Sequence, residues 1–172
     1  KLKELIGGTI FAVSENQGRP IHTGVKFEVT DDSITANYSL SNMSGKAENK
    51  AALQRMMGLN EDPSTPIVAI VSRLVSHKGV DLVCEVLEGI MGTGAQLVVL
   101  GKGDAAYEEF FKQAQQGYPG QLSAQIAYSD KLSRQIYSGA DLFLMPSKSE
   151  PCGRSQMIAM RYGTVPIVRE TG

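Results

Sequence analysis

The chain has 172 residues, 42% of them hydrophobic, and its 17 basic and 18 acidic residues give a formal net charge of −1. This length suits one compact core, so we expect a single domain with some additional pieces. A charge so close to zero offers no long-range attraction for nucleic acid or an anionic membrane, and we expect neither as a partner. Any anionic ligand must therefore be held by a few local groups.

The sequence shows no targeting signal and only two cysteines, which favours a location inside the cell. The sequence has no apolar run of about 18 residues that could span a membrane, and its first ten residues are too mixed for a signal peptide. Cys84 and Cys152 are too few for a disulfide framework, and Cys84 is expected to be a small core residue. We therefore expect a cytoplasmic protein, or a plastid protein if the source is a plant.

The first part of the chain, residues 1–62, is predicted to be a connector with partial edge elements. A helix is expected over residues 46–57, and Gly58 is a suitable C-cap for it. Residues 7–45 are instead rich in Gly, Ser, Asn and Thr, which favour loops. His22, in this region, is expected to be an ordinary loop or core histidine.

From residue 63 to residue 172, short apolar segments alternate with helical patterns. The predicted strands are 66–71, 96–100, 123–127, 141–145 and 165–168. Between them, apolar residues recur at spacings of three and four, which is typical of helices with one buried face, and Asp104 and Asp130 are predicted as N-caps. The regular alternation indicates an α/β domain with a doubly wound parallel sheet, Rossmann-like, with right-handed crossovers. Ligands of such sheets bind at the carboxyl ends of the strands, near the switch in strand order.

Polar residues follow each of the first three predicted strands. Arg73 and Lys78 could converge on a diphosphate, although surface cations near a helix start are often simply solvated. Gly101 and Gly103 could let a ligand approach the backbone, or could only make a tight turn. The Tyr128 ring could stack on a base, or could pack half-buried against a neighbouring helix.

The fourth predicted strand leads to Glu150, which stands directly before Pro151. Proline favours an extended conformation for the preceding residue, so the carboxylate is expected to project into the crevice. Gly153, Arg154 and Ser155 are predicted to form the first turn of the next helix, where free N–H groups suit phosphate. We expect phosphate at this helix start and a neutral or transiently cationic group beside Glu150. A surface carboxylate that caps nearby N–H groups is the alternative.

Several stretches, in their order and spacing, resemble the C-terminal half of bacterial glycogen synthases and plant starch synthases. They are SRLVSHKG, GKGD, PSKSEPCGRSQ and RYGTVPIVRETG, with GKAENKAALQRMMGL resembling the segment just before that half. The likeness extends over about residues 31–172. It implies the donor half of a GT-B glycosyltransferase, in which two Rossmann-like domains face each other across a cleft.

In this family glucose is transferred from ADP-glucose to an α-1,4-glucan with retention. The resemblance implies ADP-glucose or ADP as the ligand, no metal or other cofactor, and a glucan acceptor bound through an N-terminal domain that this chain lacks. We therefore expect the chain alone to fold, to bind nucleotide weakly and to be inactive. The ending at RETG, inside a family motif, suggests a chain cut from a longer enzyme.

The resemblance also implies roles for individual residues. Arg73 and Lys78 match the pair that neutralises the donor diphosphate and stabilises departing ADP, and Glu150 matches the carboxylate beside the transferred glucose. The remaining matches are Tyr128 near the adenine, Gly101 and Gly103 in the glycine-containing loop, Cys152 and Gly153 in the turn against glucose and phosphates, and Ser155 at a phosphate.

The chain departs from the family pattern at Ser149, where an aromatic residue is usual, and at Arg154, where leucine is usual. The sugar-side wall is therefore expected to be more polar, with Arg154 either contacting phosphate or pointing to solvent. Ile158 stands where many GT-B transferases have a second glutamate. Three alternatives stay open: a GT-B transferase with another sugar nucleotide, a non-catalytic nucleotide- or glucan-sensing module, and a flavodoxin-like regulatory domain.

Overall fold

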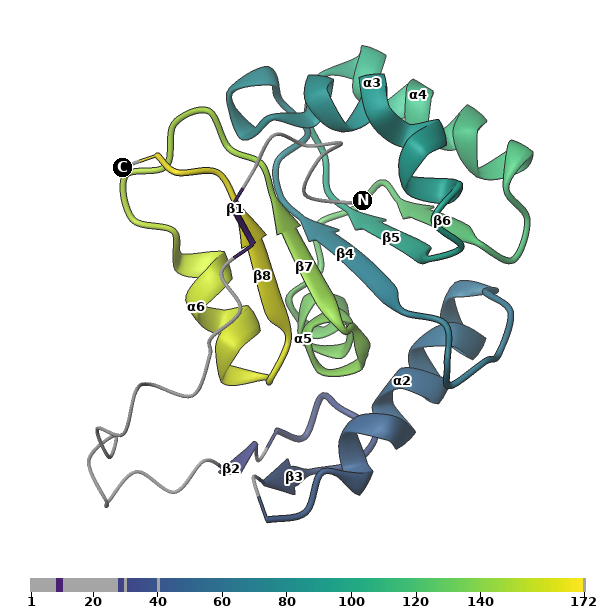
Figure 1. The fold of residues 1–172 in the computed structure, drawn as a ribbon, viewed down its shortest axis with the longest axis vertical. Helices are drawn as coiled ribbons and strands as arrows, with labels where there is room; N and C mark the ends of the chain where they lie inside the picture. The colour runs from purple at the N-terminus through teal and green to yellow at the C-terminus, as the bar shows by residue number, and fades with distance from the viewer. Residues whose placement is uncertain (1–8, 11–27, 30, 40, 172) are drawn as a thin grey trace.

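The computed structural model describes residues 9–10, 28–29, 31–39 and 41–171 (Figure 1). His22 lies outside the described residues, so the expectation for it stays a prediction. No helix in the described ranges has both the length and the apolarity needed to cross a bilayer.

All five predicted strands are present and form one parallel sheet. They are β4 (Ile67–Val71), β5 (Gln96–Leu100), β6 (Leu122–Gln125), β7 (Leu142–Met145) and β8 (Val165–Val168). Their order is β8-β7-β4-β5-β6, and the short strand β1 (Thr9–Ile10) pairs antiparallel with β8 at the edge (Figure 1). The strand order therefore reverses between β4 and β7, which confirms the doubly wound, Rossmann-like sheet.

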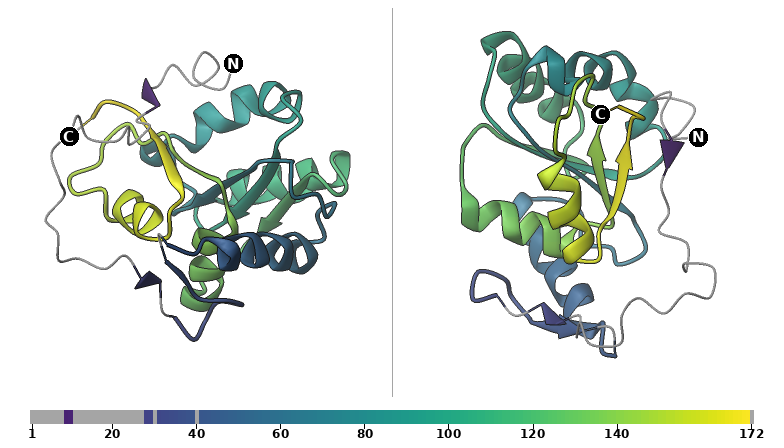
Figure 2. Two further views of the ribbon diagram at one scale, coloured as in Figure 1. Left: turned by 60° about the horizontal axis from the view of Figure 1, so that its bottom comes forward. Right: turned by 90° about the vertical axis from the view of Figure 1, so that its left-hand side faces the viewer.

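Helices cover both faces of this sheet, as Figures 1 and 2 show. Helices α3 (Val80–Met91) and α4 (Ala105–Gly117) pack on one face. The helices on the other face are α2 (Ser44–Met57), α5 (Asp130–Gly139) and α6 (Arg154–Arg161). Alternate strand residues serve the two cores: Val68 and Ile70 face α3 and α4, whereas Ile67 and Ala69 face the other layer. Burial on both faces explains why these strands are almost continuously apolar in sequence.

Two short strands and one helical turn complete the described elements, and all three lie outside the main sheet. Strands β2 (Glu28–Val29) and β3 (Tyr38–Ser39) pair antiparallel. The turn η1 (Ser76–Lys78) joins β4 to α3. The predicted core position of Cys84 holds, since its side chain packs against the core under α3 and burial raises the pKa of its thiol to about 11.

The predicted helix ends are partly right. Gly58 ends α2 in the left-handed region with φ +66°, as the C-cap prediction requires. Asp104 is the N-cap residue of α4, but its side chain accepts no capping hydrogen bond. The prediction of Asp130 as the cap of α5 is wrong: Ser129 has the extended backbone of an N-cap, and its Oγ accepts from the Leu132 N–H at 3.2 Å. Asp130 is instead the first helical residue, where a negative charge suits the helix dipole.

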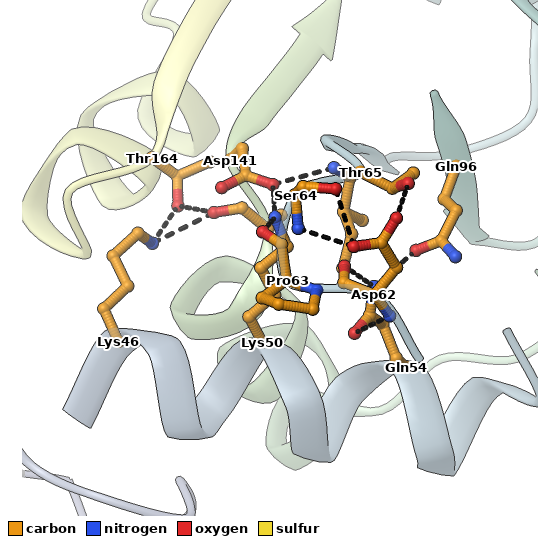
Figure 3. Close-up of polar contacts among 12 residues, drawn as sticks. Lys46, Lys50, Gln54, Asp62, Pro63, Ser64, Thr65, Gln96, Asp141 and Thr164 are labelled. Carbon is orange, nitrogen blue, oxygen red and sulfur yellow. Dashed lines mark hydrogen bonds and ion pairs between the residues drawn. The ribbon is translucent and has the colours of Figure 1, made fainter. Parts of the chain in front are cut away.

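Helix α2 is tied to the amino ends of the strands by its polar side chains (Figure 3). Lys46 Nζ donates to the carbonyl oxygens of Ser138, Ala140 and Tyr162 and to Thr164 Oγ1, at 3.0 to 3.2 Å. Burial lowers the pKa of Lys46 to about 8, so the ammonium still predominates at pH 7.

The next turns of α2 extend the same attachment along the sheet. Lys50 Nζ lies 2.9 Å from Asp141 Oδ2, directly before β7. Gln54 Nε2 donates to Gln96 Oε1 at 2.9 Å, at the start of β5. Helix α2 therefore belongs to the packed domain, and it holds the edge of the sheet opposite the carboxyl ends of the strands.

Candidate functional site

The carboxyl ends of β4 and β7 meet at the switch in strand order, and an ion pair crosses this point. Lys78 Nζ lies 2.7 Å from Glu150 Oε2, with the two side chains only 18% and 14% exposed. Ser147 Oγ donates to the same oxygen at 3.0 Å. The hydrogen bond from Lys78, helped by those from Ser147 and the Gly153 backbone, lowers the pKa of Glu150. The carboxylate is therefore ionised at neutral pH, in a largely desolvated position.

The two loops behind this pair touch through their backbones. Gly79 ends η1 with φ +74°, and a Cβ atom placed on it would lie 2.1 Å from the carbonyl oxygen of Pro146. Lys148 N–H also donates to the His77 carbonyl at 2.9 Å. Close approach at Gly79 thus allows Lys78 and Glu150 to meet.

A first hollow, the Tyr128 hollow, is lined by residues that follow β4, β5 and β6 and has a volume of about 270 Å³. The structure brings four of the predicted site residues to it: Arg73, Gly101, Tyr128 and Ser155. Tyr128 is 90% exposed, so its side chain is not packed half-buried against a neighbouring helix. Arg73 is exposed as well, with Nη2 3.3 Å from His77 Nε2. An open aromatic ring and an exposed guanidinium at one hollow suit a ligand with a flat base and an anionic group.

The glycines after β5 serve a close packing of loops. A Cβ atom on Gly101 would lie 1.9 Å from the Ser72 carbonyl oxygen, and one on Gly103 would lie 2.1 Å from that of Leu74. Leu74 and Gly103 also form a parallel bridge. Gly101 lines the Tyr128 hollow, whereas Gly103 does not line it. The glycines therefore hold the segment after β5 against the segment after β4.

A second hollow, the Glu150 hollow, is lined by Glu150 itself and has a volume of about 100 Å³. Glu150, Cys152 and Gly153 line it together with Arg169 and Thr171, which follow β8. Gly153 is the N-cap of α6 with φ +68°, a conformation that suits glycine. Carboxylate, hydroxyl and backbone groups converge here, as a polyhydroxylated ligand would require.

A match to a known protein family shows which family this chain belongs to. The family model for group 1 glycosyl transferases matches residues 55–172. The chain belongs to this family.

Relatives of this glycosyltransferase chain are glycogen synthases. It is 50% identical over 143 residues to that of Thermosipho melanesiensis, covering 83% of this chain and 30% of the relative. It is 53% identical over 142 residues to that of Geobacillus thermodenitrificans, covering 83% and 29%. The resemblance to glycogen synthases is thus confirmed, and the chain spans about 30% of the length of these relatives.

Two solved structures agree with the fold. The catalytic domain of starch synthase IV from Arabidopsis thaliana, bound to ADP and acarbose, superposes with a TM-score of 0.78 at 38% identity, over 83% of this chain and 30% of that one. Anabaena HepE, in complex with UDP and glucose, superposes with a TM-score of 0.57 at 19% identity, over 73% and 34%, and shows likeness of fold alone. The predicted Rossmann-like half of a GT-B transferase is confirmed.

Arg154, a predicted site residue of this glycosyltransferase domain, lies away from both hollows. Arg154 lines a groove between α5 and α6, together with Ser133, Arg134 and Met157. It borders neither the Tyr128 hollow nor the Glu150 hollow. The structure therefore does not bring Arg154 together with Arg73 and Lys78.

Sequence reasoning missed several residues that this family member places at the site. Arg169 follows β8 at the carboxyl edge, so the strand-end rule used for Arg73 could have found it. Lys102, between Gly101 and Gly103, lines the Tyr128 hollow. Ser147 and His77 carry no sequence signal, because their roles arise from contacts with Glu150 and Arg73.

Replacing Gly79 by alanine should disrupt this site of the glycosyltransferase domain. The new Cβ would meet the Pro146 carbonyl, and the positive φ would add about 1 kcal/mol of strain. We expect the melting temperature to fall, as measured by thermal unfolding. Gly94→Ala is the matched control, since Gly94 has φ +83° but open space around its Cβ. Equal effects of both substitutions would show that contact with Pro146 is unimportant.

Proposed function

We propose that this chain is the ADP-glucose-binding part of a retaining glucosyltransferase that extends α-1,4-glucan, as in glycogen and starch synthases. The observation that carries the proposal is the Lys78–Glu150 ion pair across the switch in strand order. The glycogen synthase relatives and the ADP-bound starch synthase structure support it.

The nucleotide is proposed to occupy the Tyr128 hollow. Its base would stack on the exposed Tyr128 ring, an interaction that contributes about 1 to 3 kcal/mol per base in related stacking sites. Gly101 and Ser155 line the same hollow and would lie along the ribose and phosphates. Tyr128 is a suitable platform because 90% of its surface is open to a ligand.

The diphosphate is proposed to bind between Arg73 and Lys78. An ammonium group has three donors, so Lys78 can keep its bond to Glu150 and still donate to a phosphate oxygen. Charge-assisted hydrogen bonds contribute about 1.5 to 3 kcal/mol each, so two or three could hold a nucleotide diphosphate at about micromolar level. The two cations supply the positive charge that the departing ADP needs, and we propose that no metal is required.

The transferred glucose is proposed to lie in the Glu150 hollow. The ionised Glu150 can accept hydrogen bonds from sugar hydroxyl groups, and Cys152 and Gly153 would line the other side. During transfer the bond between the anomeric carbon and the phosphate oxygen breaks, and its electron pair leaves with ADP. An acceptor hydroxyl forms the new bond to that carbon, and its proton passes to the departing phosphate. A fixed carboxylate beside the sugar stabilises the positive charge that develops on the ring.

Transfer to an acceptor is proposed to need a second domain. Both walls of a cleft are required to exclude water and to align the acceptor with the sugar. This chain alone is therefore expected to bind nucleotide without elongating glucan. We propose a cytoplasmic setting with no nucleic acid or membrane partner, in keeping with the near-zero net charge.

Calorimetric titration with ADP, UDP and ADP-glucose tests the donor site. We expect ADP and ADP-glucose to bind more tightly than UDP, and the Arg73→Ala/Lys78→Ala variant to bind ADP about 100-fold more weakly or worse, since two charge-assisted bonds are lost. The matched control is Arg55→Ala/Lys112→Ala, which removes an arginine and a lysine at exposed positions away from both hollows.

Three results would argue against the proposal in different ways. Tighter binding of UDP would favour another sugar nucleotide. Equal ADP binding by the Arg73/Lys78 variant and its control would place the nucleotide elsewhere. Nucleotide binding with no glucan elongation, after the chain is joined to an N-terminal half, would favour a non-catalytic sensing module.

A further inference from the structure

A second ion pair crosses the switch in strand order, beside the Lys78–Glu150 pair. Lys148, in the loop between β7 and α6, contacts Asp81 in the first turn of α3 through its Nζ and the carboxylate Oδ2. The two side chains are 38% and 28% exposed, so water reaches this contact only in part. The bond with Lys148 lowers the pKa of Asp81, which keeps the carboxylate ionised. This pair has no part in the site described above.

Asp81 stands on a rigid element, whereas Lys148 does not. Helix α3 is anchored by Val80, Val83 and Ile90, each no more than 3% exposed. An acidic residue in its first turn is also favoured by the helix dipole. The loop from residue 146 to residue 153 contains no helix or strand, although it carries Glu150. A charged contact with α3 is thus well placed to fix this loop.

The order of positive and negative charges in the two pairs sets the position of the loop against the segment it faces. Lys148 and Glu150 lie two residues apart on the loop. They meet Asp81, in the first turn of α3, and Lys78, which ends η1 three positions earlier. The cation of the loop, Lys148, meets the anion Asp81, and the anion of the loop, Glu150, meets the cation Lys78. A slip that placed Lys148 opposite Lys78 would bring like charges together, which is unfavourable. The pattern therefore selects one position of Glu150.

Asp81 depends strongly on this contact. Its second oxygen, Oδ1, is buried and has no hydrogen-bond partner among the described residues. Lys148 supplies the strongest hydrogen bond of this carboxylate, so separation of the pair is unfavourable, although the partial exposure of Asp81 moderates the loss. Lys148 is further held by its backbone N–H, which donates to the His77 carbonyl at 2.9 Å.

We propose that Asp81 is a positioning residue, which holds Lys148 and thereby fixes Glu150 against Lys78. The role in donor binding rests on the proposed function, whereas the role in placing Glu150 does not. Asp81 itself lines neither the Tyr128 hollow nor the Glu150 hollow, so it would act through the loop.

The test is the titration of the Glu150 carboxyl by carbon-13 NMR in the full 172-residue chain and in Asp81→Asn. Glu150→Gln assigns the signal. Removal of one negative charge would, by electrostatics alone, move the Glu150 midpoint down. Loss of positioning would separate Glu150 from Lys78 and move the midpoint up, toward the ordinary range of glutamate. We expect the upward shift, and an unchanged or lower midpoint would overturn the proposal.

Two further variants and a measurement of ADP binding separate the positioning role of Asp81 from misfolding and from the proposed function. Lys148→Arg keeps the charge and should retain the midpoint of the unmodified chain, whereas a shift as large as that of Asp81→Asn would contradict the proposal. If Asp81→Asn does not fold, Asp81→Ser keeps an oxygen in the first turn and replaces it in the same titration. Absence of ADP binding in the unmodified chain, with the expected upward shift in Asp81→Asn, would reject the proposed function and keep the positioning role.

Discussion

Replacing Lys46 by methionine is expected to lower the free energy of unfolding by about 2 to 4 kcal/mol, because buried oxygens lose their donor. The four acceptors come from the end of α5, the end of α6 and the turn before β8, so this one ammonium joins three parts of the fold to α2. Methionine fills a similar volume but donates nothing. Urea unfolding monitored by circular dichroism would measure the change.

Lys112→Met, on the exposed side of α4, is the control for this prediction. It makes the same chemical change without removing a buried donor, and it should alter stability by less than about 0.5 kcal/mol. A Lys46→Met variant as stable as this control would show that the acceptor oxygens are satisfied by water or by each other.

Glu150→Gln is expected to abolish most of the transfer while sparing nucleotide binding. The measurement requires this chain joined to the N-terminal half of a glycogen synthase, such as that of Geobacillus thermodenitrificans, a relative at 53% identity. Loss of a carboxylate that stabilises developing charge should reduce kcat by about 100-fold to 10,000-fold. ADP affinity should be equal or higher, because Lys78 no longer shares its charge with Glu150.

A specific role of Glu150 in transfer predicts that kcat falls while ADP affinity is kept, whereas general disruption of the fold would lower both. Arg73→Ala/Lys78→Ala should lose ADP binding, whereas Glu150→Gln should keep it. Glu88→Gln, at an exposed position of α3, should change neither quantity. Near-normal kcat in Glu150→Gln would remove Glu150 from the proposed transfer.

The pH dependence of the Lys78–Glu150 pair follows from the same contact. Because the folded-state pKa of Glu150 is lowered, the pair stabilises the fold at pH values above the ordinary glutamate pKa. That stabilisation is lost as the pH falls through the lowered value. Replacing Lys78 by methionine should therefore lower stability at neutral pH and reduce the acid dependence that Glu150 contributes, so that urea unfolding at a series of pH values shows the variant and the unmodified chain converging in acid.

The sequence alone determined the elements and the edge of the sheet on which the site lies. Apolar runs and helical spacing are local properties, so the five strands and the helices between them could be predicted with small errors at their ends. The strand-end rule then placed Arg73, Lys78, Tyr128 and Glu150 at one edge, because parallel strands point the same way. The likeness to glycogen synthases also rests on local motifs.

The tertiary structure decided which of these residues meet. Lys78 and Glu150 are 72 positions apart, and Asp81 and Lys148 are 67 apart. Their contacts depend on β7 lying next to β4 rather than next to β6, and no local pattern encodes that neighbour. The Lys46 contacts depend in the same way on the packing of α2 across the amino ends of the strands. Side chains at such distances are brought together by the order of the strands and the packing of whole helices, which is a property of the complete chain.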